Sequence, residues 1–368
     1  MSNLTRPDES LFMTLDGMRG IGAVLVVIGH CLIFWGGLPM QIQLTPYLVD
    51  MFFVFSGFVI AYAFEPRIRR GMTVGGFMLQ RVIRLYPIFL IGLVMGLCVH
   101  IIAWQDDHKS SGTIALEIVP QFLMLPSLNT NEVSIFTLNG PSWSLFFELC
   151  ANLLYILIFR FLSMRVLIGV VILMAAAMVV STYHYGEAHV GWSQAHVWGG
   201  FPRAGFGFFM GVQMFRLAGS PKAPPRRISA WACLIILTPI PVTALLVPET
   251  IKLPVQLFVA LIYGPALIWL AMLVQPPRFL HKLCARAGAL SYPIYMLHFP
   301  MLALFERIAW KHPDIVKHGP WIGVGLLVAS IALAAAVERF YDTPVRSWIG
   351  RKLKERRRTA PPQSFVAK

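Results

Sequence analysis

The chain has 368 residues, of which 57% are hydrophobic and 13% are charged, and its mean hydropathy is +0.67. Soluble globular proteins carry about 25% charged residues, so this composition excludes an ordinary soluble enzyme. Lys and Arg outnumber Asp and Glu by 31 to 17, which gives a net charge of +14. The basic residues are scattered between apolar blocks, and this scatter argues against a nucleic-acid-binding patch.

Apolar blocks of about 18 to 22 residues follow one another along the chain, and this is the length of a helix that spans a bilayer. Lipid forces backbone polar groups to pair within their own helix. The sequence therefore predicts an all-α fold, a polytopic transmembrane helix bundle. We expect about ten spans, at 17–35, 47–64, 86–104, 141–159, 166–182, 198–215, 229–247, 254–274, 289–306 and 320–338.

A shorter apolar stretch at 114–128 contains Glu117 and two prolines. It is too short and too interrupted to span, so we expect one interfacial or re-entrant segment there. The blocks divide the chain into three parts. These are a cytoplasmic N-terminal segment (1–13), a membrane domain (14–350) and a basic cytoplasmic tail (351–368) that is partly disordered.

The placement of Lys and Arg predicts the topology. If the N-terminus is cytoplasmic, most of the 31 basic residues fall in inside segments, among them Arg67, Arg69 and Arg70. This bias follows the positive-inside rule and predicts a multi-pass protein with both termini in the cytoplasm. The tail sequence RKLKERRR is expected to meet the anionic head groups of membrane lipid.

The first span carries two costly polar groups, Arg19 and His30. Eleven residues separate them, which is about 16 Å along a helix and about three turns, so both side chains fall on one face. Polar groups within a span are functional candidates by default. A packing histidine and an ordinary snorkelling arginine explain the same spacing, and the spacing alone does not decide between the two readings.

Other spans place polar groups at a similar depth. Glu148 lies about seven residues into a span that enters from the outside, and His298 lies near the middle of another, with Tyr292 before it. Asp50 stands near the outer end of the second span. Two histidines and a carboxylate at one depth indicate a site, although a proton relay uses the same residue types. An isolated carboxylate in lipid is strongly penalised, so Glu148 is expected to have a partner.

Arg81 and Arg84 stand three residues apart, on one helical face just before the third span. Guanidinium groups bind phosphates in a bidentate manner, so these two residues and Arg19 are candidates for binding a phosphorylated donor. Anchoring by the positive-inside rule is the alternative for each of them. No P-loop and no Rossmann fingerprint occurs, so we expect no nucleotide site of either kind. No H-E-x-x-H or C-x-x-C pair occurs, so we expect no metal.

Six motifs in order then carry a resemblance, namely LDGMRGIGAVLVVIGH, DMFFVFSGFVI, RVIRLYP, PSWSLFFELC, SYPIYMLHFP and ERFYDTPVR. The chain resembles the acyltransferase-3 family of bacterial membrane O-acyltransferases over about residues 14–350. The resemblance implies transfer of an acyl group, commonly acetyl, from cytoplasmic acyl-CoA to a carbohydrate or glycolipid acceptor at the inner membrane. It also implies an essential role for Arg19 and His30. The loop arginines of the family correspond to Arg81 and Arg84, and its Trp-Ser-Leu…Glu element to Trp143, Ser144 and Glu148.

Residues and resemblance together predict a mechanism. Acyl-CoA binds through Arg19, Arg81 and Arg84, and its pantetheine arm carries the thioester to His30. His30 acts as general base or as nucleophile, and Glu148 is expected to face it and orient it. Two alternatives stay open, a proton-coupled transporter of a small molecule and a non-catalytic scaffold. The sequence identifies neither the acceptor nor the oligomeric state.

Overall fold

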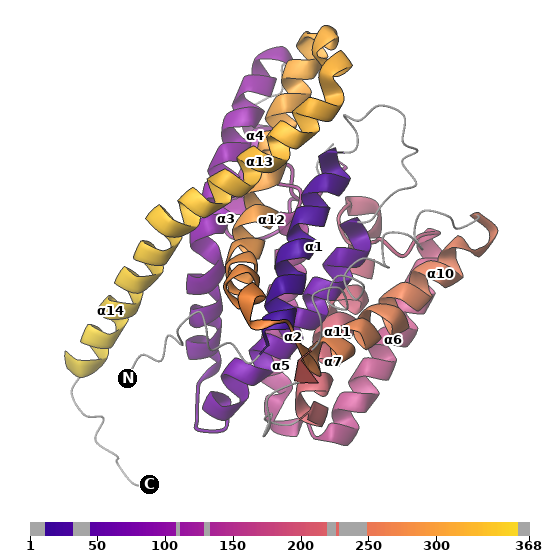
Figure 1. Ribbon diagram of the computed structural model, residues 1–368, viewed down its shortest axis with the longest axis vertical. Helices are drawn as coiled ribbons and strands as arrows, with labels where there is room; N and C mark the ends of the chain where they lie inside the picture. Colours follow the sequence, from indigo (N-terminus) through magenta and orange to yellow (C-terminus); the bar gives the residue numbers. More distant parts are fainter. Residues whose placement is uncertain are drawn as a thin grey trace.

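The computed structural model is a bundle of long helices (Figure 1). It describes residues 12–31, 45–107, 111–128, 133–218, 226–227 and 249–359. In these ranges the strands are a parallel pair of two residues each, β1 (Arg226–Arg227) and β2 (Val274–Gln275). The predicted all-α class is confirmed.

The helices of the bundle follow in chain order, with short 3₁₀ turns between several of them. They are α1 (Met13–Cys31), α2 (Thr45–Ile68), α3 (Val74–Asp107), α4 (Ser111–Phe122), α5 (Ser142–Ile158), α6 (Met164–Tyr185), α7 (Gly200–Ala218), α10 (Lys252–Phe258), α11 (Gly264–Met272), α12 (His281–Lys311), α13 (Gly319–Val337) and α14 (Thr343–Thr359). Single π-turns, Val259–Tyr263 and Glu338–Asp342, join α10 to α11 and α13 to α14.

Eight helical segments of the described ranges are long and apolar enough to cross a membrane, and each matches one of the ten predicted spans. The predicted span 198–215 is also a helix, α7, but it is not among the eight. The predicted span 229–247 lies outside the described residues. The stretch 114–128 forms the end of the 12-residue helix α4 and a turn, which is too short to span, as the sequence predicts.

Small residues bring two helix pairs into close contact. Gly211 of α7 lies against the carbonyl of Val54 on α2, and Gly20 of α1 lies against Ala287 on α12. A side chain at either glycine would clash with its neighbour, because the backbones approach too closely to admit a Cβ. The pair α1–α12 joins the first helix to one of the last, and it forms one wall of the site described below.

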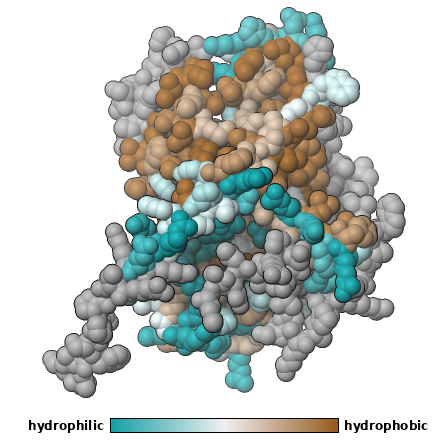
Figure 2. All heavy atoms as spheres, turned by 60° about the vertical axis from the view of Figure 1, so that its left-hand side comes forward, coloured by the Kyte–Doolittle hydropathy of each residue, from teal (hydrophilic) through white to brown (hydrophobic). Residues whose placement is uncertain are grey.

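The outer surface of the bundle is apolar. Val94 and Ile101 on α3, Ile172 on α6, and Val324 and Val328 on α13 are all exposed. Figure 2 shows hydrophobic residues gathered over the upper part of one face, with hydrophilic residues below. A band of this kind is what lipid requires of a membrane-spanning bundle, so the chain is a multi-pass membrane protein.

The two ends of the bundle differ in charge. We call the basic end the one that carries the α2–α3 turn, with Arg67, Arg69 and Arg70, and the α5–α6 turn, with Arg160. The far end carries the start of α2 and residues 186–199. Helix α14 slants away from the bundle at the lower left of Figure 1. Its start is tied to the bundle through Asp342, which pairs with Arg84 of α3 at 3.7 Å and with Arg346.

Candidate active site

A cavity of about 310 Å³ lies inside the bundle between α1, α2, α3, α5 and α12. Its wall is formed by Arg19, Val49, Phe52, Phe53, Phe55, Ser56, Val59, Ile60, Arg81, Arg84, Leu85, Ser144, Leu145, Glu148, Ser291, Tyr292 and Tyr295. Six of the ten site residues predicted from sequence are in this wall, from four different helices.

Two arginines reach the cavity from the half of the bundle nearer the basic end. The Arg19 Nη2 donates to Ser291 Oγ of α12 at 3.2 Å, and its Nη1 lies 3.6 Å from Asp16. Arg84 lies with its guanidinium 5.9 Å from the centre of the Tyr292 ring. Its side chain keeps about a third of its surface exposed, at 35%. Both residues therefore offer donors to a ligand without needing a large rearrangement.

The centre of the wall holds an ion pair between α3 and α5. Arg81 Nη2 donates to Glu148 Oε1 at 2.6 Å, and Ser56 Oγ donates to the same oxygen at 2.6 Å. The Nε of Arg81 is buried and has no hydrogen-bond partner. Such an unused buried donor is costly, so its position beside an open cavity is consistent with a site that binds a polar ligand.

His30 meets His298 rather than a carboxylate. His298 Nε2 lies 3.4 Å from His30 Nδ1, and the two ring centres are 5.0 Å apart. His30 Nδ1 also lies 2.9 Å from the carbonyl oxygen of Val26, and His298 Nδ1 lies 3.1 Å from that of Ile294. Carbonyl oxygens only accept, so in the neutral rings both Nδ1 atoms carry the proton. The Nε2 of His30 is then left with its lone pair, as a base or nucleophile requires.

The predicted pairing of His30 with Glu148 is wrong in this structure, because each residue has another partner. Glu148 accepts hydrogen bonds from Arg81 and Ser56, and the ring of His30 contacts that of His298. The expectation rested on matching depth in the membrane, and depth does not say which helices are neighbours. Helix α1 packs mainly on α12, whereas α5 packs on α7 and α3. The expectation that Arg19 and His30 share one face is confirmed, since both reach α12.

Two further predicted residues position the wall. Ser144 Oγ and the Tyr295 hydroxyl lie 2.9 Å apart, and the Ser144 hydroxyl donates to the carbonyl of Pro141 at 3.0 Å. The Tyr292 hydroxyl donates to the carbonyl of Leu85 at 2.7 Å. The wall on the side of α12 is therefore held by hydroxyl groups as well as by packing.

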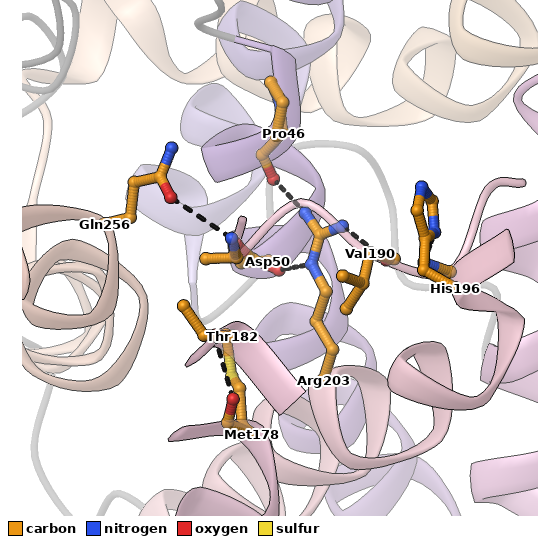
Figure 3. A network of polar contacts seen from close by, with 10 residues as sticks. Pro46, Asp50, Met178, Thr182, Val190, His196, Arg203 and Gln256 are labelled. Carbon is orange, nitrogen blue, oxygen red and sulfur yellow. Dashed lines mark hydrogen bonds and ion pairs between the residues drawn. The ribbon is translucent and has the colours of Figure 1, made fainter. Parts of the chain in front are cut away.

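Asp50 and Trp143 lie outside the cavity wall. Asp50 belongs to a second polar cluster at the far end (Figure 3). Its centre is Arg203 of α7, which donates from Nε to Asp50 Oδ1 at 2.6 Å. Arg203 also donates to the carbonyls of Val190 and Pro46, and its guanidinium lies 5.2 Å from the Trp143 ring centre. Sequence reasoning missed Arg203 as a site residue, although an arginine inside a predicted span was a visible signal.

In the part of the chain that the structure describes, no group of three or more His, Cys, Asp or Glu side chains is placed to hold a metal ion. The charged groups that face the cavity are three arginines and one carboxylate. This set is suited to anions, because guanidinium groups bind phosphate and carboxylate oxygens through two parallel hydrogen bonds.

A membrane-spanning bundle that encloses an arginine-lined cavity next to a histidine pair defines a multi-pass membrane protein with a buried polar site. Comparison with known sequences makes the class specific. The sequence model of the acyltransferase domain family, acyltransferase-3, matches residues 14–339. The chain belongs to this family and is a membrane acyltransferase, as the resemblance predicts.

One curated relative is similar to part of the chain. It is "Protein 2 in picA locus" of Rhizobium radiobacter, which is 35% identical over 161 residues. The match covers 39% of this chain and 80% of that protein. No solved structure matches the chain significantly.

Proposed function

We propose that the protein transfers an acyl group, most simply acetyl, from acyl-CoA to a hydroxyl group of a carbohydrate or glycolipid acceptor. The observation that carries this proposal is the cavity, which presents Arg19, Arg81 and Arg84 to one ligand. Its volume of about 310 Å³ is at the lower end of the range for small-molecule sites and suits the slender arm of a thioester.

In this proposal the role of each arginine in donor binding depends on how many of its hydrogen-bond donors are already used within the protein. Arg19 and Arg84 face the phosphate groups of CoA, because both retain unused or weakly used donors. Arg81 is already neutralised by Glu148, so it contributes its spare Nε–H rather than a full charge. Glu148 is proposed to fix Arg81 in the wall, which replaces the role of histidine partner expected from the sequence.

The proposed chemistry centres on Nε2 of His30. As a general base it removes the proton of the acceptor hydroxyl while the oxygen attacks the thioester carbonyl. The C–S bond breaks, CoA leaves as a thiolate and the imidazolium returns the proton to the sulfur. A covalent acyl-histidine is the second route, in which Nε2 attacks the carbonyl and the C–S bond breaks to release the CoA thiolate. The acceptor oxygen then attacks the acyl carbonyl, the C–N bond to Nε2 breaks, and the hydroxyl proton goes to the thiolate. His298 is proposed to hold the His30 ring and its tautomer in either route.

The purified protein in detergent or nanodiscs provides the test. We expect release of free CoA from acetyl-CoA, faster when candidate glycans are added. His30→Ala should lower the rate by about 10²–10⁴-fold without changing CoA affinity, since the histidine lies outside the cavity wall. His281→Ala is a matched control, because this histidine lies outside the cavity wall and contacts the carbonyl of Pro276 at 3.1 Å. Full activity in His30→Ala would refute the mechanism, and substrate flux without CoA release would indicate a transporter instead.

We also propose that the protein lies in a bacterial inner membrane with the basic end and both termini in the cytoplasm. The basic residues of the α2–α3 and α5–α6 turns support this orientation. In a background without the five native cysteines, Arg70→Cys and Lys317→Cys should label from opposite sides in intact cells. Labelling of both from one side would contradict the orientation.

A further inference from the structure

A second pocket lies at the basic end of the bundle, where α2, α5 and α7 end and α6 begins. It is open to the surface, has a volume of about 790 Å³ and shares no lining residue with the cavity of the candidate active site. We call it the arginine pocket. Its charged lining residues in the described ranges are Arg69, Arg160, Arg216 and Glu65.

The carboxylate of the arginine pocket is already paired inside the protein. Glu65 is buried, and its Oε1 accepts from Arg216 Nε at 2.6 Å and from the Tyr155 hydroxyl at 3.1 Å. Its Oε2 accepts from Arg69 Nη2 at 3.3 Å. One negative charge among the charged lining residues thus faces three positive ones, which leaves the pocket with a net charge of +2.

The three arginines keep hydrogen-bond donors for a ligand. Arg160 is exposed and forms no ion pair or hydrogen bond with any residue that the structure describes, although its guanidinium lies 4.3 Å from the ring centre of Phe161. Arg69 gives one guanidinium nitrogen to the carboxylate, and 66% of its side chain is exposed. Arg216 uses Nε for the carboxylate and Nη1 for a backbone carbonyl, which leaves its Nη2. Guanidinium groups bind phosphate oxygens well, so the pocket suits a phosphate.

One edge of the arginine pocket continues into an apolar face of α5. Leu153, Leu157 and Phe161 are spaced four residues apart, so they form one row along the helix axis, and all three are exposed. They belong to a segment that is long and apolar enough to span a membrane. Phe161 ends this row and also lines the pocket. An occupant that fills both places needs an anionic head and an apolar tail.

We propose that the arginine pocket binds the head group of an anionic phospholipid from the leaflet at the basic end. The phosphate lies between Arg69, Arg160 and Arg216, and one acyl chain follows the row from Phe161 to Leu153. The pocket stands where one membrane-spanning segment ends and the next begins, which is the depth at which a bilayer has its head groups. This inference does not depend on the proposed acyl transfer.

Topology anchoring accounts for part of this arrangement only. The positive-inside rule explains exposed arginines at this end of the bundle. It does not require a buried carboxylate that holds Arg69 and Arg216 beside one open pocket, or an apolar row that starts at the same pocket. A free phosphate uses the same guanidinium groups but has no part that covers the row. A lipid uses both features.

The experiment titrates the delipidated full chain in detergent with phosphatidylglycerol and counts bound lipids by native mass spectrometry. Phosphatidylcholine with the same acyl chains and glycerol phosphate without chains are titrated in parallel, and both should bind more weakly. Arg160→Ala should weaken phosphatidylglycerol binding by at least about 5-fold, which is what one arginine contributes near an anionic lipid surface. Without lipid this variant should fold like the wild type, because Arg160 has no ion pair with the described residues.

Arg278→Ala is the matched control, since Arg278 is an exposed arginine in another 3₁₀ turn, Arg278–Leu280, outside the arginine pocket. Its affinity for phosphatidylglycerol should equal that of the wild type. Equal losses in the two variants would overturn the site, because general attraction to a positive surface would then explain the binding. Phosphatidylcholine that binds as tightly as phosphatidylglycerol would overturn the need for an anionic head. Glycerol phosphate that binds as tightly would replace the lipid by a soluble phosphate and overturn the proposal.

Discussion

Two of the arginine–carboxylate pairs in the bundle share a contact distance of 2.6 Å but have opposite surroundings. At the far end, Arg203 pairs with Asp50, and its remaining donors go to two backbone carbonyls (Figure 3). In the middle of the bundle, Arg81 pairs with Glu148, keeps an unused Nε–H and lies in the wall of a cavity. The hydrogen bonding of Arg203 is satisfied within the protein, whereas that of Arg81 is not.

The difference shows how to separate a structural arginine from one that serves a ligand inside a membrane protein. Burial does not separate them, since the side chains of Arg203 and Arg81 are 1% and 10% exposed. Distance to the carboxylate does not separate them either. What differs is whether each guanidinium nitrogen has a hydrogen-bond partner, as all three of Arg203 have and Nε of Arg81 has not, and whether the side chain lines a cavity.

The largest expected effect is on the stability of the protein when the Arg203–Asp50 pair is broken. Arg203→Ala should lower the free energy of unfolding by about 3–5 kcal/mol, because Asp50 is left as a buried charge without its partner. Thermal or denaturant unfolding of the detergent-solubilised protein measures this. Arg160→Ala, at an exposed turn, should stay within about 0.5 kcal/mol of wild type. Equal losses in both variants would remove the basis of the comparison.

The next largest effect is on the binding of acyl-CoA in the cavity. Arg84→Ala should weaken acyl-CoA binding by about 1.5–3 kcal/mol, because a charge-assisted hydrogen bond to phosphate is lost. Stability should change little, since Arg84 is partly exposed and its ion pair with Asp342 is long at 3.7 Å. Calorimetric titration with CoA gives the affinity, with Arg70→Ala as control. An unchanged affinity would assign Arg84 to anchoring of the topology alone.

A matched pair of carboxylate variants tests the comparison directly. Asp50→Asn leaves the Arg203 charge enclosed and should cost about 3 kcal/mol of stability. Glu148→Gln should cost only about 1 kcal/mol, because its amide oxygen still accepts from Ser56 and Arg81 and water in the cavity solvates the freed charge. The two unfolding curves are measured side by side. A larger loss of stability in Glu148→Gln than in Asp50→Asn would contradict the assignment of Arg203–Asp50 as the structural pair and Arg81–Glu148 as the pair that serves a ligand.

The smallest effect is a pH dependence at the far end. Burial, together with the positive charges of Arg203 and Lys252, lowers the pKa of His189 well below its ordinary value. The folded protein then keeps this ring neutral while the unfolded chain takes up a proton below about pH 6.5. Stability from this source is therefore present above that pH and is lost on acidification, by about 1.4 kcal/mol at pH 5.5.

His189→Gln removes the titrating ring and provides the control for this prediction. Its loss of thermal stability between pH 7.5 and pH 5.5 should be smaller than that of the wild type by the amount above. An identical acid sensitivity in the two proteins would mean that His189 is protonated in the folded state or is not enclosed.

Sequence reasoning predicted the helix class and the face that Arg19 and His30 share, because both depend on positions within one helix. The spacing of Arg81 and Arg84 likewise placed both in one cavity wall. The partner of His30 could not be predicted in the same way. It depends on which helices are neighbours, and His298 lies 268 residues further along the chain.

The partners of Arg203 could not be predicted from the sequence either. Its carboxylate partner lies on α2, 153 residues earlier, and its other acceptors are backbone carbonyls with no signature in the side-chain sequence. The sequence analysis named Asp50 and Trp143 as site residues, and the structure places both beside Arg203, outside the cavity wall. Only the packing of α2 on α7 brings the partners together.

The pairing of α1 with α12 also has a consequence for how the protein is made. Arg19 and Ser291 are 272 residues apart, so the ribosome finishes α1 long before it synthesises the helix that completes the site. At 5–20 residues per second this delay is roughly 15 to 55 s. During that time the nascent chain carries an arginine and a histidine in its first inserted helix without their final neighbours. The site therefore cannot form during synthesis of the first helices, and the enzyme cannot work before α12 is in place.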